Sequence, residues 1–72
     1  MKREEIIIEI KEILLDDTLG VDDTIEFDSM SVLLLIAFLD DNFSIPVQEP
    51  EIKKFKSISS ILTFIGNENI EQ

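Results

Sequence analysis

The chain of 72 residues contains no cysteine and no histidine, and it also lacks tryptophan and tyrosine. Without cysteine there is no disulfide framework and no thiolate metal site. Without histidine the chain lacks the most common general base and zinc ligand, and it cannot form a Ser-His-Asp triad. We therefore expect a protein that binds or carries a group, and not an enzyme.

Positive charge is also scarce. The chain has 6 Lys+Arg against 16 Asp+Glu, which gives a formal net charge of -10. Such a surface repels phosphate backbones and anionic lipid headgroups, so we expect neither a nucleic acid nor a membrane as a partner. Proteins with basic patches are the favoured partners, and self-repulsion between copies favours a monomer.

Long hydrophobic runs are absent as well. The longest apolar run, Val32 to Leu39, is far shorter than the roughly 20 residues of a membrane-spanning helix. The N-terminus has no signal-peptide pattern, so we expect a cytoplasmic protein. A hydrophobic fraction of 44% is too high for a disordered acidic chain. The length fits a single domain covering residues 1–72.

Hydrophobic periodicity predicts an all-α fold, a small four-helix bundle with a long first loop and a short third helix. The first helix is expected from Arg3 to Leu15. Its apolar arc consists of Ile6, Ile7, Ile10, Ile13 and Leu14. Ile8 lies off this arc, and we expect it to be exposed.

The second helix is expected to begin at Asp28 or Ser29, both good N-caps, and to run to about Asn42. It is apolar on two sides. One arc holds Val32, Leu35, Ile36, Leu39 and Phe43, and the opposite arc holds Met30, Leu33, Leu34, Ala37 and Phe38. A helix with two apolar sides is central in the fold, contacts partners, or does both.

The C-terminal third is expected to hold two shorter helices. Pro50 suits the first turn of the third helix. Ser57 should cap the fourth, whose apolar residues recur at helical spacing: Ile58, Ile61, Leu62 and Ile65. Gly66 should end that helix, and residues 66–72 are expected to form a frayed polar tail.

Residues 16–28 have no helical period and include two pairs of adjacent aspartates. We interpret them as a long loop held against the core by spaced apolar residues: Leu19, Val21, Ile25 and Phe27. The acids do not follow the order of an EF-hand loop, which needs a central glycine and a closing glutamate. We therefore predict no metal site.

Ser29 stands where the loop becomes the second helix, in the string Phe27-Asp28-Ser29-Met30. The free amide groups and the positive dipole end of a helix N-terminus favour an attached phosphate there. The sequence offers no base to activate this serine, so another protein would have to act on it. An ordinary helix-capping serine is the alternative interpretation.

This string resembles the Asp-Ser-Leu signature of acyl carrier proteins and related carrier domains, with methionine in place of leucine. The likeness continues without a gap over nearly the whole chain, although the first loop is somewhat short. It includes buried helix positions (Leu35, Ile36, Leu39), an acidic pair (Asp40, Asp41), the helix-ending aromatic Phe43 and the aliphatic Val47, and it keeps the family spacing to Phe64-Ile65.

The resemblance implies that a phosphopantetheinyl transferase attaches 4'-phosphopantetheine from coenzyme A to Ser29, beside the helix cap Asp28 and next to Met30. The thiol of this arm would carry acyl or aminoacyl groups as thioesters. Loading and transferring enzymes with basic patches would dock on the second helix. The docking residues implied are Leu33, Leu34, Ala37, Asp40 and Asp41.

Leu34 departs from the family pattern, because many members have a glutamate at the matching position. Two interpretations stay open. Leu34 belongs to an apolar patch that faces partners, or Leu34 and Phe38 pack against the first helix or the loop. Asp40 and Asp41 can likewise be read as docking residues or as a solvated helix end.

The resemblance also implies a lining for an acyl chain, made of Phe43, Val47, Ile52, Phe55 and Leu62. Because Ile52 and Phe55 are bulky, this lining favours a small or unsheltered cargo, and plain core is the alternative. Phe-Asp-Ser-Met also looks like the string of D-alanyl carrier proteins, so we expect a specialised pathway. A different class of protein, an unmodified acidic adaptor or inhibitor, would have the same charge but no use for Ser29.

Overall fold

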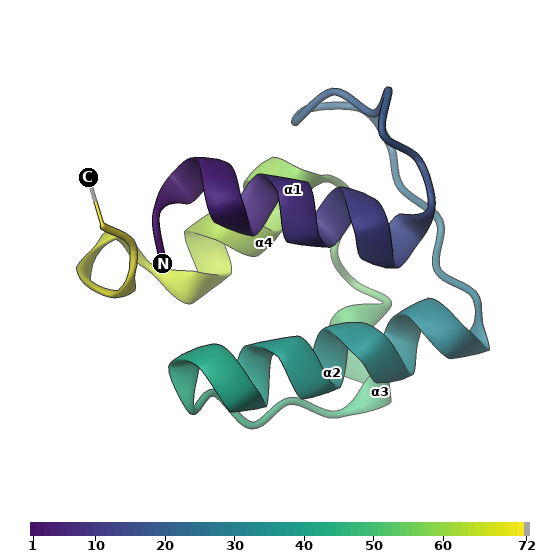
Figure 1. Ribbon diagram of the computed structural model, residues 1–72. Coiled ribbons are helices and arrows are strands. Elements are labelled where there is room, and N and C mark those ends of the chain that lie inside the picture. Colours follow the sequence, from purple (N-terminus) through teal and green to yellow (C-terminus); the bar gives the residue numbers. More distant parts are fainter. Residues whose placement is uncertain (72) are drawn as a thin grey trace.

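A computed structural model of the protein describes residues 1–71 (Figure 1). Four α-helices follow one another, α1 (Arg3–Leu14), α2 (Ser29–Phe43), α3 (Glu49–Ile52) and α4 (Ile58–Ile65), and the 3-10 turn η1 (Asn67–Asn69) follows α4. Lys2 and Glu71 form an isolated β-bridge, and the described residues contain no β-strand. The predicted all-α fold is confirmed, as are the long first loop and the short third helix.

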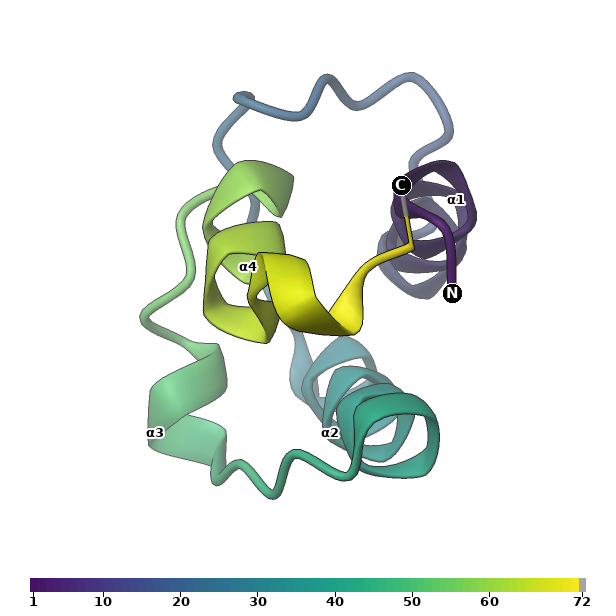
Figure 2. The ribbon, with the colours of Figure 1, turned by 90° about the vertical axis from the view of Figure 1, so that its left-hand side faces the viewer.

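The helices surround a common centre (Figure 2). The two longest, α1 and α2, lie one above the other and run in opposite directions (Figure 1). Contacts join α1 to both α2 and α4, and α3 packs against α2. Among residues 1–71 no helix has both the length and the apolar character needed to cross a membrane.

The predicted inner faces meet in one hydrophobic core. Ile6 and Ile10 of α1 are completely buried, and so are Leu35 and Leu39 of α2. The remaining apolar residues of the α1 arc are half-buried and packed against this core: Ile7, Ile13 and Leu14. Ile8 is exposed, as its position off the arc predicts.

The loop of residues 15–28 is held down by apolar side chains and by two backbone hydrogen bonds. Ile25 is buried, and the predicted positions around it are packed against the core: Leu19, Val21 and Phe27. The Ile25 amide donates to the Lys56 carbonyl at 3.0 Å, and the Ser59 amide donates to the Val21 carbonyl at 2.9 Å. The loop is therefore fastened to the start of α4 shortly before it enters α2.

The helix ends follow local chemistry. The first helix ends at Leu14, one residue earlier than predicted, because Leu15 adopts a left-handed conformation with φ 57°. Pro50 lies in the first turn of α3, and Ser57 caps α4 by accepting from the Ser60 amide at 3.2 Å. Gly66 ends α4 with φ 88°, a value that favours glycine. The predictions for Pro50, Ser57 and Gly66 are confirmed.

The prediction of a frayed polar tail is wrong for residues 66–71, and Gln72 lies outside the described residues. Ile70 is only 6% exposed and belongs to the hydrophobic core. The Glu71 amide donates to the Met1 carbonyl at 2.9 Å. In Figure 2 this segment crosses from α4 to α1. A single isoleucine among polar residues gives no periodic signal, yet its burial and the hydrogen bond to Met1 dock the segment.

Replacing Ile70 with alanine is expected to destabilise the protein by about 2 kcal/mol or more, because the change removes buried methylene groups and leaves a cavity. The matched control is Ile8→Ala, the same truncation at a side chain that is 55% exposed. That control should stay within about 0.5 kcal/mol of wild type. Urea unfolding followed by circular dichroism measures both. Equal midpoints for the two variants would contradict a docked C-terminal segment.

Candidate functional site

The start of α2 is fixed by hydrogen bonds between Asp28 and Ser31. The Asp28 carboxylate accepts from the Ser31 amide at 2.8 Å, and the Asp28 amide donates to the Ser31 Oγ at 2.9 Å. The N-cap is therefore Asp28, the first of the two predicted candidates, and Ser29 is the first helical residue. Ser31 was not predicted from the sequence as a residue of the site. The signal was its spacing, since a capping box pairs the N-cap with the residue three positions later.

The hydrogen bonds also set the charge state of Asp28. The Ser31 amide, followed by the Ser31 hydroxyl, lowers the pKa of the exposed Asp28 carboxyl from its usual 3.8. A carboxylate with a lowered pKa is a weak base. Asp28 is thus an anionic helix cap engaged by the Ser31 amide, and among residues 1–71 no hydrogen bond joins its carboxylate to the Ser29 hydroxyl.

Ser29 is exposed on the first turn of α2, and within residues 1–71 no hydrogen bond engages its hydroxyl. Helix amides at this end have no partners inside the helix, and the helix dipole adds positive potential. The Ser31 amide is already used by Asp28, and the Met30 amide also lowers the pKa of the Asp28 carboxyl, so the Ser29 amide is the one of the first turn that remains for an anion attached to Ser29. The residues present therefore fit a phosphodiester on Ser29.

The predicted docking residues lie together on one side of α2. The exposed fractions of Met30, Leu33 and Leu34 are 65%, 64% and 45%. Ala37, Asp40 and Asp41 are also exposed. Spacings of three, four and seven residues place all six on one face of a helix. We call this set the outer face of α2: Met30, Leu33, Leu34, Ala37, Asp40 and Asp41.

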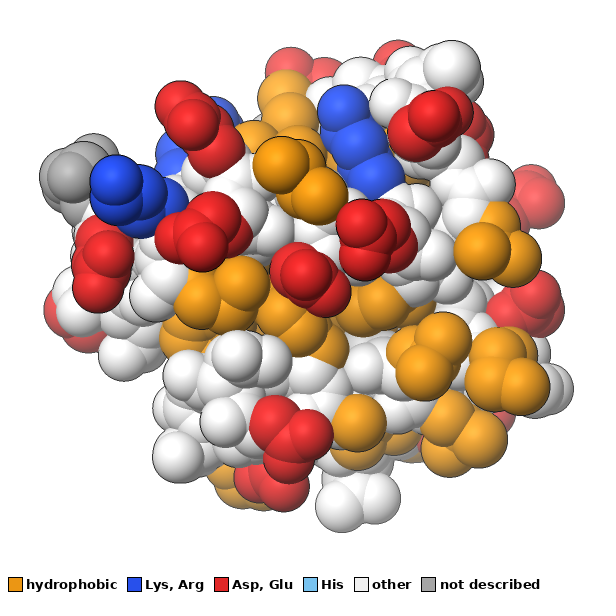
Figure 3. Space-filling view, in the orientation of Figure 1, with side chains coloured by type: hydrophobic (Ala, Val, Ile, Leu, Met, Phe, Trp, Pro, Cys, Tyr) orange, Lys and Arg blue, Asp and Glu red, His pale blue; other side chains and the backbone are white. Residues whose placement is uncertain are grey.

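In the space-filling view, hydrophobic side chains gather over the part of α2 nearest the first loop, while acidic side chains are spread along α1 (Figure 3). Ser29 is the first residue of α2 and lies at this same end of the helix. An apolar surface thus borders the exposed serine, and the two aspartates follow toward the other end of the helix. The structure brings together the predicted attachment and docking residues.

Phe38 does not belong to this surface. Sequence spacing placed it on the same arc as Leu34, but Phe38 is only 8% exposed, and its ring packs edge-to-face on Phe43 at 5.8 Å between ring centroids. Phe38 follows Leu35 by three residues, so it borders the inner face of α2 and turns into the core. Each interpretation therefore holds for one residue, because Phe38 packs into the core while Leu34 is 45% exposed on the outer face of α2.

The predicted acyl lining is part of the packed interior. Val47, Ile52 and Leu62 are buried core residues, and Phe43 and Phe55 are half-buried against the same core. The Phe55 ring also packs edge-to-face on Phe64, at 5.2 Å between centroids. All five predicted residues thus lie in or against one cluster of side chains, which fits the alternative of plain core.

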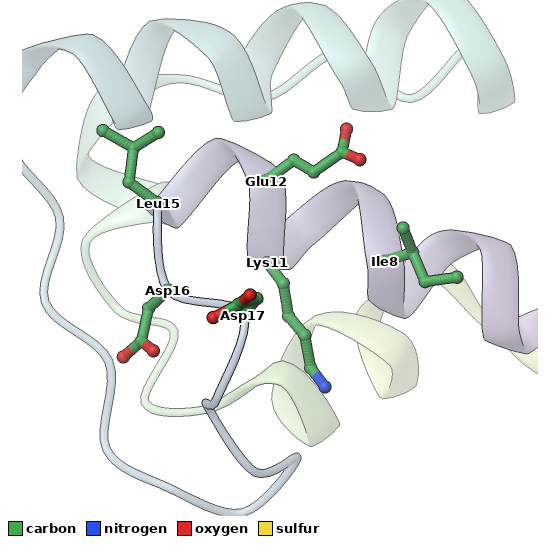
Figure 4. A pocket seen from close by; sticks show the side chains of 6 residues that line it. All are labelled: Ile8, Lys11, Glu12, Leu15, Asp16 and Asp17. Carbon is green, nitrogen blue, oxygen red and sulfur yellow. The ribbon is translucent and has the colours of Figure 1, made fainter.

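A surface depression that was not predicted lies on α1 and the start of the first loop (Figure 4). Its lining mixes apolar and charged residues: Ile8, Lys11, Glu12, Leu15, Asp16 and Asp17. In Figure 4 these side chains point in different directions, with Lys11 and Leu15 on opposite sides. They do not converge on a common point, so this depression has no geometry for catalysis.

Three aspartates of the first loop form hydrogen bonds, two within the loop and one to α4. Asp16 accepts from the amide and the hydroxyl of Thr18, Asp22 accepts from the Ser59 hydroxyl, and Asp23 accepts from the Gly20 amide. Over the described part of the chain, no group of three His, Cys, Asp or Glu side chains is arranged to hold a metal ion. Asp16 and Asp23 thus shape the loop itself, while Asp22 joins it to α4.

Comparisons of the chain with models of protein families, with curated proteins and with solved structures found no match. The resemblance of the Phe27–Met30 string to carrier proteins therefore stays a prediction, and a functional conclusion has to come from the site.

Leu34→Glu is expected to leave stability within about 0.5 kcal/mol of wild type, because the side chain is already 45% exposed. Phe38→Ala, one turn further along α2, is expected to cost about 3 kcal/mol through the cavity it leaves. Thermal unfolding of the two variants measures the contrast. If Leu34→Glu is as destabilising as Phe38→Ala, then Leu34 is a core residue and the outer face does not extend to it.

Asp28→Asn keeps an oxygen acceptor at the cap but removes its charge. The folded pKa of Asp28 lies below the unfolded value of 3.8, so the anion stabilises the native state above that pH. This contribution should disappear as the pH falls through 3.8 and then through the folded pKa. The stability difference between wild type and Asp28→Asn is therefore expected at neutral pH and should vanish in strong acid.

Urea unfolding of both proteins at several pH values measures this difference. The control is Asp41→Asn, which removes an exposed carboxylate near the other end of the same helix, where a negative charge opposes the helix dipole. Asp41→Asn should show no loss of stability at neutral pH. A difference for Asp28→Asn that persists unchanged in strong acid would contradict the role of the charge.

Proposed function

We propose that this protein is an acyl-carrier-type protein that holds its cargo on a 4'-phosphopantetheine arm attached to Ser29. In this proposal the four helices are a carrier bundle, with the long first loop leading to the attachment serine. The protein itself is not an enzyme. It presents the arm to a phosphopantetheinyl transferase and afterwards to enzymes that load and transfer acyl or aminoacyl groups.

The observation that carries the proposal is the setting of Ser29. Its exposed hydroxyl stands on the first turn of α2, next to a cap that is tied down and beside an exposed apolar surface. An ordinary capping serine would use its hydroxyl to accept a helix amide. Here Asp28 does that work, so the Ser29 hydroxyl has no structural task within the described residues.

The modification requires a phosphoryl transfer from coenzyme A. A bond forms between Ser29 Oγ and the phosphorus that bears pantetheine, and the pyrophosphate bond to the adenosine bisphosphate leaving group breaks. The serine proton goes to a base of the transferase, because Asp28 is a weak base. When bound, the arm supplies a thiol that holds an acyl group as a thioester, which a chain without cysteine cannot offer.

The chain contributes accessibility and docking. A flexible tether raises the effective concentration of the cargo at whichever enzyme is bound. The outer face of α2 presents apolar contacts next to Ser29 and two carboxylates further along, which suits an apolar enzyme surface bordered by Lys or Arg. Asp40 and Asp41 would then influence mainly the association rate and the choice of partner.

The close packing of the core limits the size of the acyl group that the bundle could enclose. Of the residues that would line an acyl chamber, Val47, Ile52 and Leu62 are buried among other side chains, and Phe43 and Phe55 are half-buried against the same core. Sheltering a long chain would require these residues to move apart, at the cost of close packing. A small acyl or aminoacyl cargo that stays outside the bundle, as in a specialised biosynthetic pathway, fits this interior better.

An unmodified acidic adaptor is the alternative function, and the outer face of α2 favours it equally, because an exposed apolar surface suits protein–protein contact in general. The two functions differ in their need for Ser29. A carrier is inactive without covalent modification there, whereas an adaptor binds its partner with the serine untouched.

Incubation with coenzyme A and a broad-specificity phosphopantetheinyl transferase is expected to add one phosphopantetheine to the wild-type protein. Intact mass spectrometry measures the gain, and Ser29→Ala is expected to show none. The matched control is Ser59→Ala, which removes a hydroxyl from α4 and should leave the modification complete. An unmodified wild type, with a transferase proven on another carrier, would contradict the proposal.

A further inference from the structure

Asp28 and Ser31 close a four-residue turn that holds Ser29 between them. Besides the two hydrogen bonds already described, the Ser31 hydroxyl donates to the Asp28 carbonyl at 3.1 Å. The same carbonyl accepts from the Val32 amide at 3.0 Å. The amide, carbonyl and carboxylate of Asp28 are therefore all engaged, and two of these bonds depend on the hydroxyl of Ser31.

Ser31 differs from the other polar residues in its burial. Ser31 is 5% exposed, and among the described residues it is the one polar side chain that is buried. Asp28 and Ser29, which belong to the same turn, are exposed. A short hydroxyl at this capping position must lie close to the backbone to reach Asp28. The longer Glu or Gln usual at this position of a capping box spans the same gap with a mobile side chain.

The fourth helix contains a second turn of the same construction. There the Ser57 amide donates to Ser60 Oγ at 3.2 Å, and the Ser60 hydroxyl donates to the Ser57 carbonyl at 2.6 Å. The residue that follows this cap is Ile58, which is completely buried. Ser31 and Ser60 thus perform the same structural task, but only the turn of α2 holds an exposed serine in the position after the cap.

We infer that Ser31 is a positioning residue for the modification of Ser29, an inference that rests on the proposed function. In the transfer, Ser29 Oγ must approach the phosphorus in line with the pyrophosphate bond that breaks. A turn closed by Ser31 limits the directions that Ser29 can take before the transferase binds. Orientation of this kind contributes strongly to rate, and a small displacement of a reacting group costs up to about 100-fold.

The experiment compares three variants as substrates of the phosphopantetheinyl transferase with coenzyme A. Ser31→Ala removes both hydroxyl-dependent hydrogen bonds, Ser31→Thr keeps the hydroxyl, and Ser60→Ala removes the equivalent bonds from α4. Circular dichroism at the assay temperature establishes that each variant is folded. If Ser31→Ala does not fold, Ser31→Asp is used: a carboxylate keeps an acceptor for the Asp28 amide but cannot donate to the Asp28 carbonyl, so a smaller loss of rate is expected, and a wild-type rate would overturn the inference.

Ser31→Ala is expected to lower kcat by about tenfold with little change in KM, because the outer face of α2 is intact and only the orientation of Ser29 is lost. Ser31→Thr and Ser60→Ala should be modified at the wild-type rate. Amide hydrogen exchange should accelerate at Asp28 in Ser31→Ala and stay slow there in Ser60→Ala. A general loss of stability from a missing helix cap would affect both alanine variants alike, so it cannot produce this pattern.

Equal modification rates for Ser31→Ala and Ser60→Ala would overturn the inference and leave the proposed function in place. A wild-type protein that takes no phosphopantetheine would instead overturn the proposed function, and the role of Ser31 with it.

Discussion

The burial of one side of α2 is the constraint on which the rest of this structure depends. Leu35 and Leu39 are completely buried, and Val32 is 3% exposed, so the rotation of the helix about its own axis is fixed. Side chains follow one another at a regular angle around a helix. Once the inner side is held, Ser29 and the outer face must point to solvent. The core therefore determines where the chemistry of the surface lies.

The first loop adds the second constraint, because it fixes where α2 begins. Ile25 is buried and bonded to the carbonyl of Lys56, so the chain approaches α2 from a defined direction. Asp28 is the N-cap at which the loop ends and the helix begins. Its hydrogen bonds with Ser31 leave the Ser29 hydroxyl unused. The packed loop and the Asp28 cap thus place Ser29 at a defined position at the start of α2.

The sequence predicted those features that arise from repeated spacing. The apolar arcs gave the helices and their buried faces, and the capping residues Ser57 and Gly66 gave the ends of α4. Single contacts carry no such repetition. Ile70 docks the C-terminal segment through one side chain, and Phe38 lies at the border between the two arcs of α2, where packing against Phe43 decides its direction. Neither outcome is encoded in periodicity.

In the candidate site, too, some features follow from repeated spacing and others depend on single contacts. An exposed Ser29 at a helix start and an outer face with Leu34 and Asp40 follow from the pattern of α2. The role of Ser31 follows only in part, because its spacing from Asp28 permits a capping box, but a serine inside a helical pattern has many uses and its three-dimensional partners decide among them. Hydrogen bonds in both directions to Asp28 become visible only when the backbone of the turn is in place.

The most direct test of the central claim is the state of Ser29 in the cell that makes the protein. Intact mass spectrometry of the protein recovered from those cells, followed by fragmentation of the peptide that contains Ser29 and Ser31, identifies the modified residue. A carrier function requires one phosphopantetheine on Ser29 and none on Ser31. Protein recovered without the arm from cells with an active transferase, or with the arm on another serine, would contradict it.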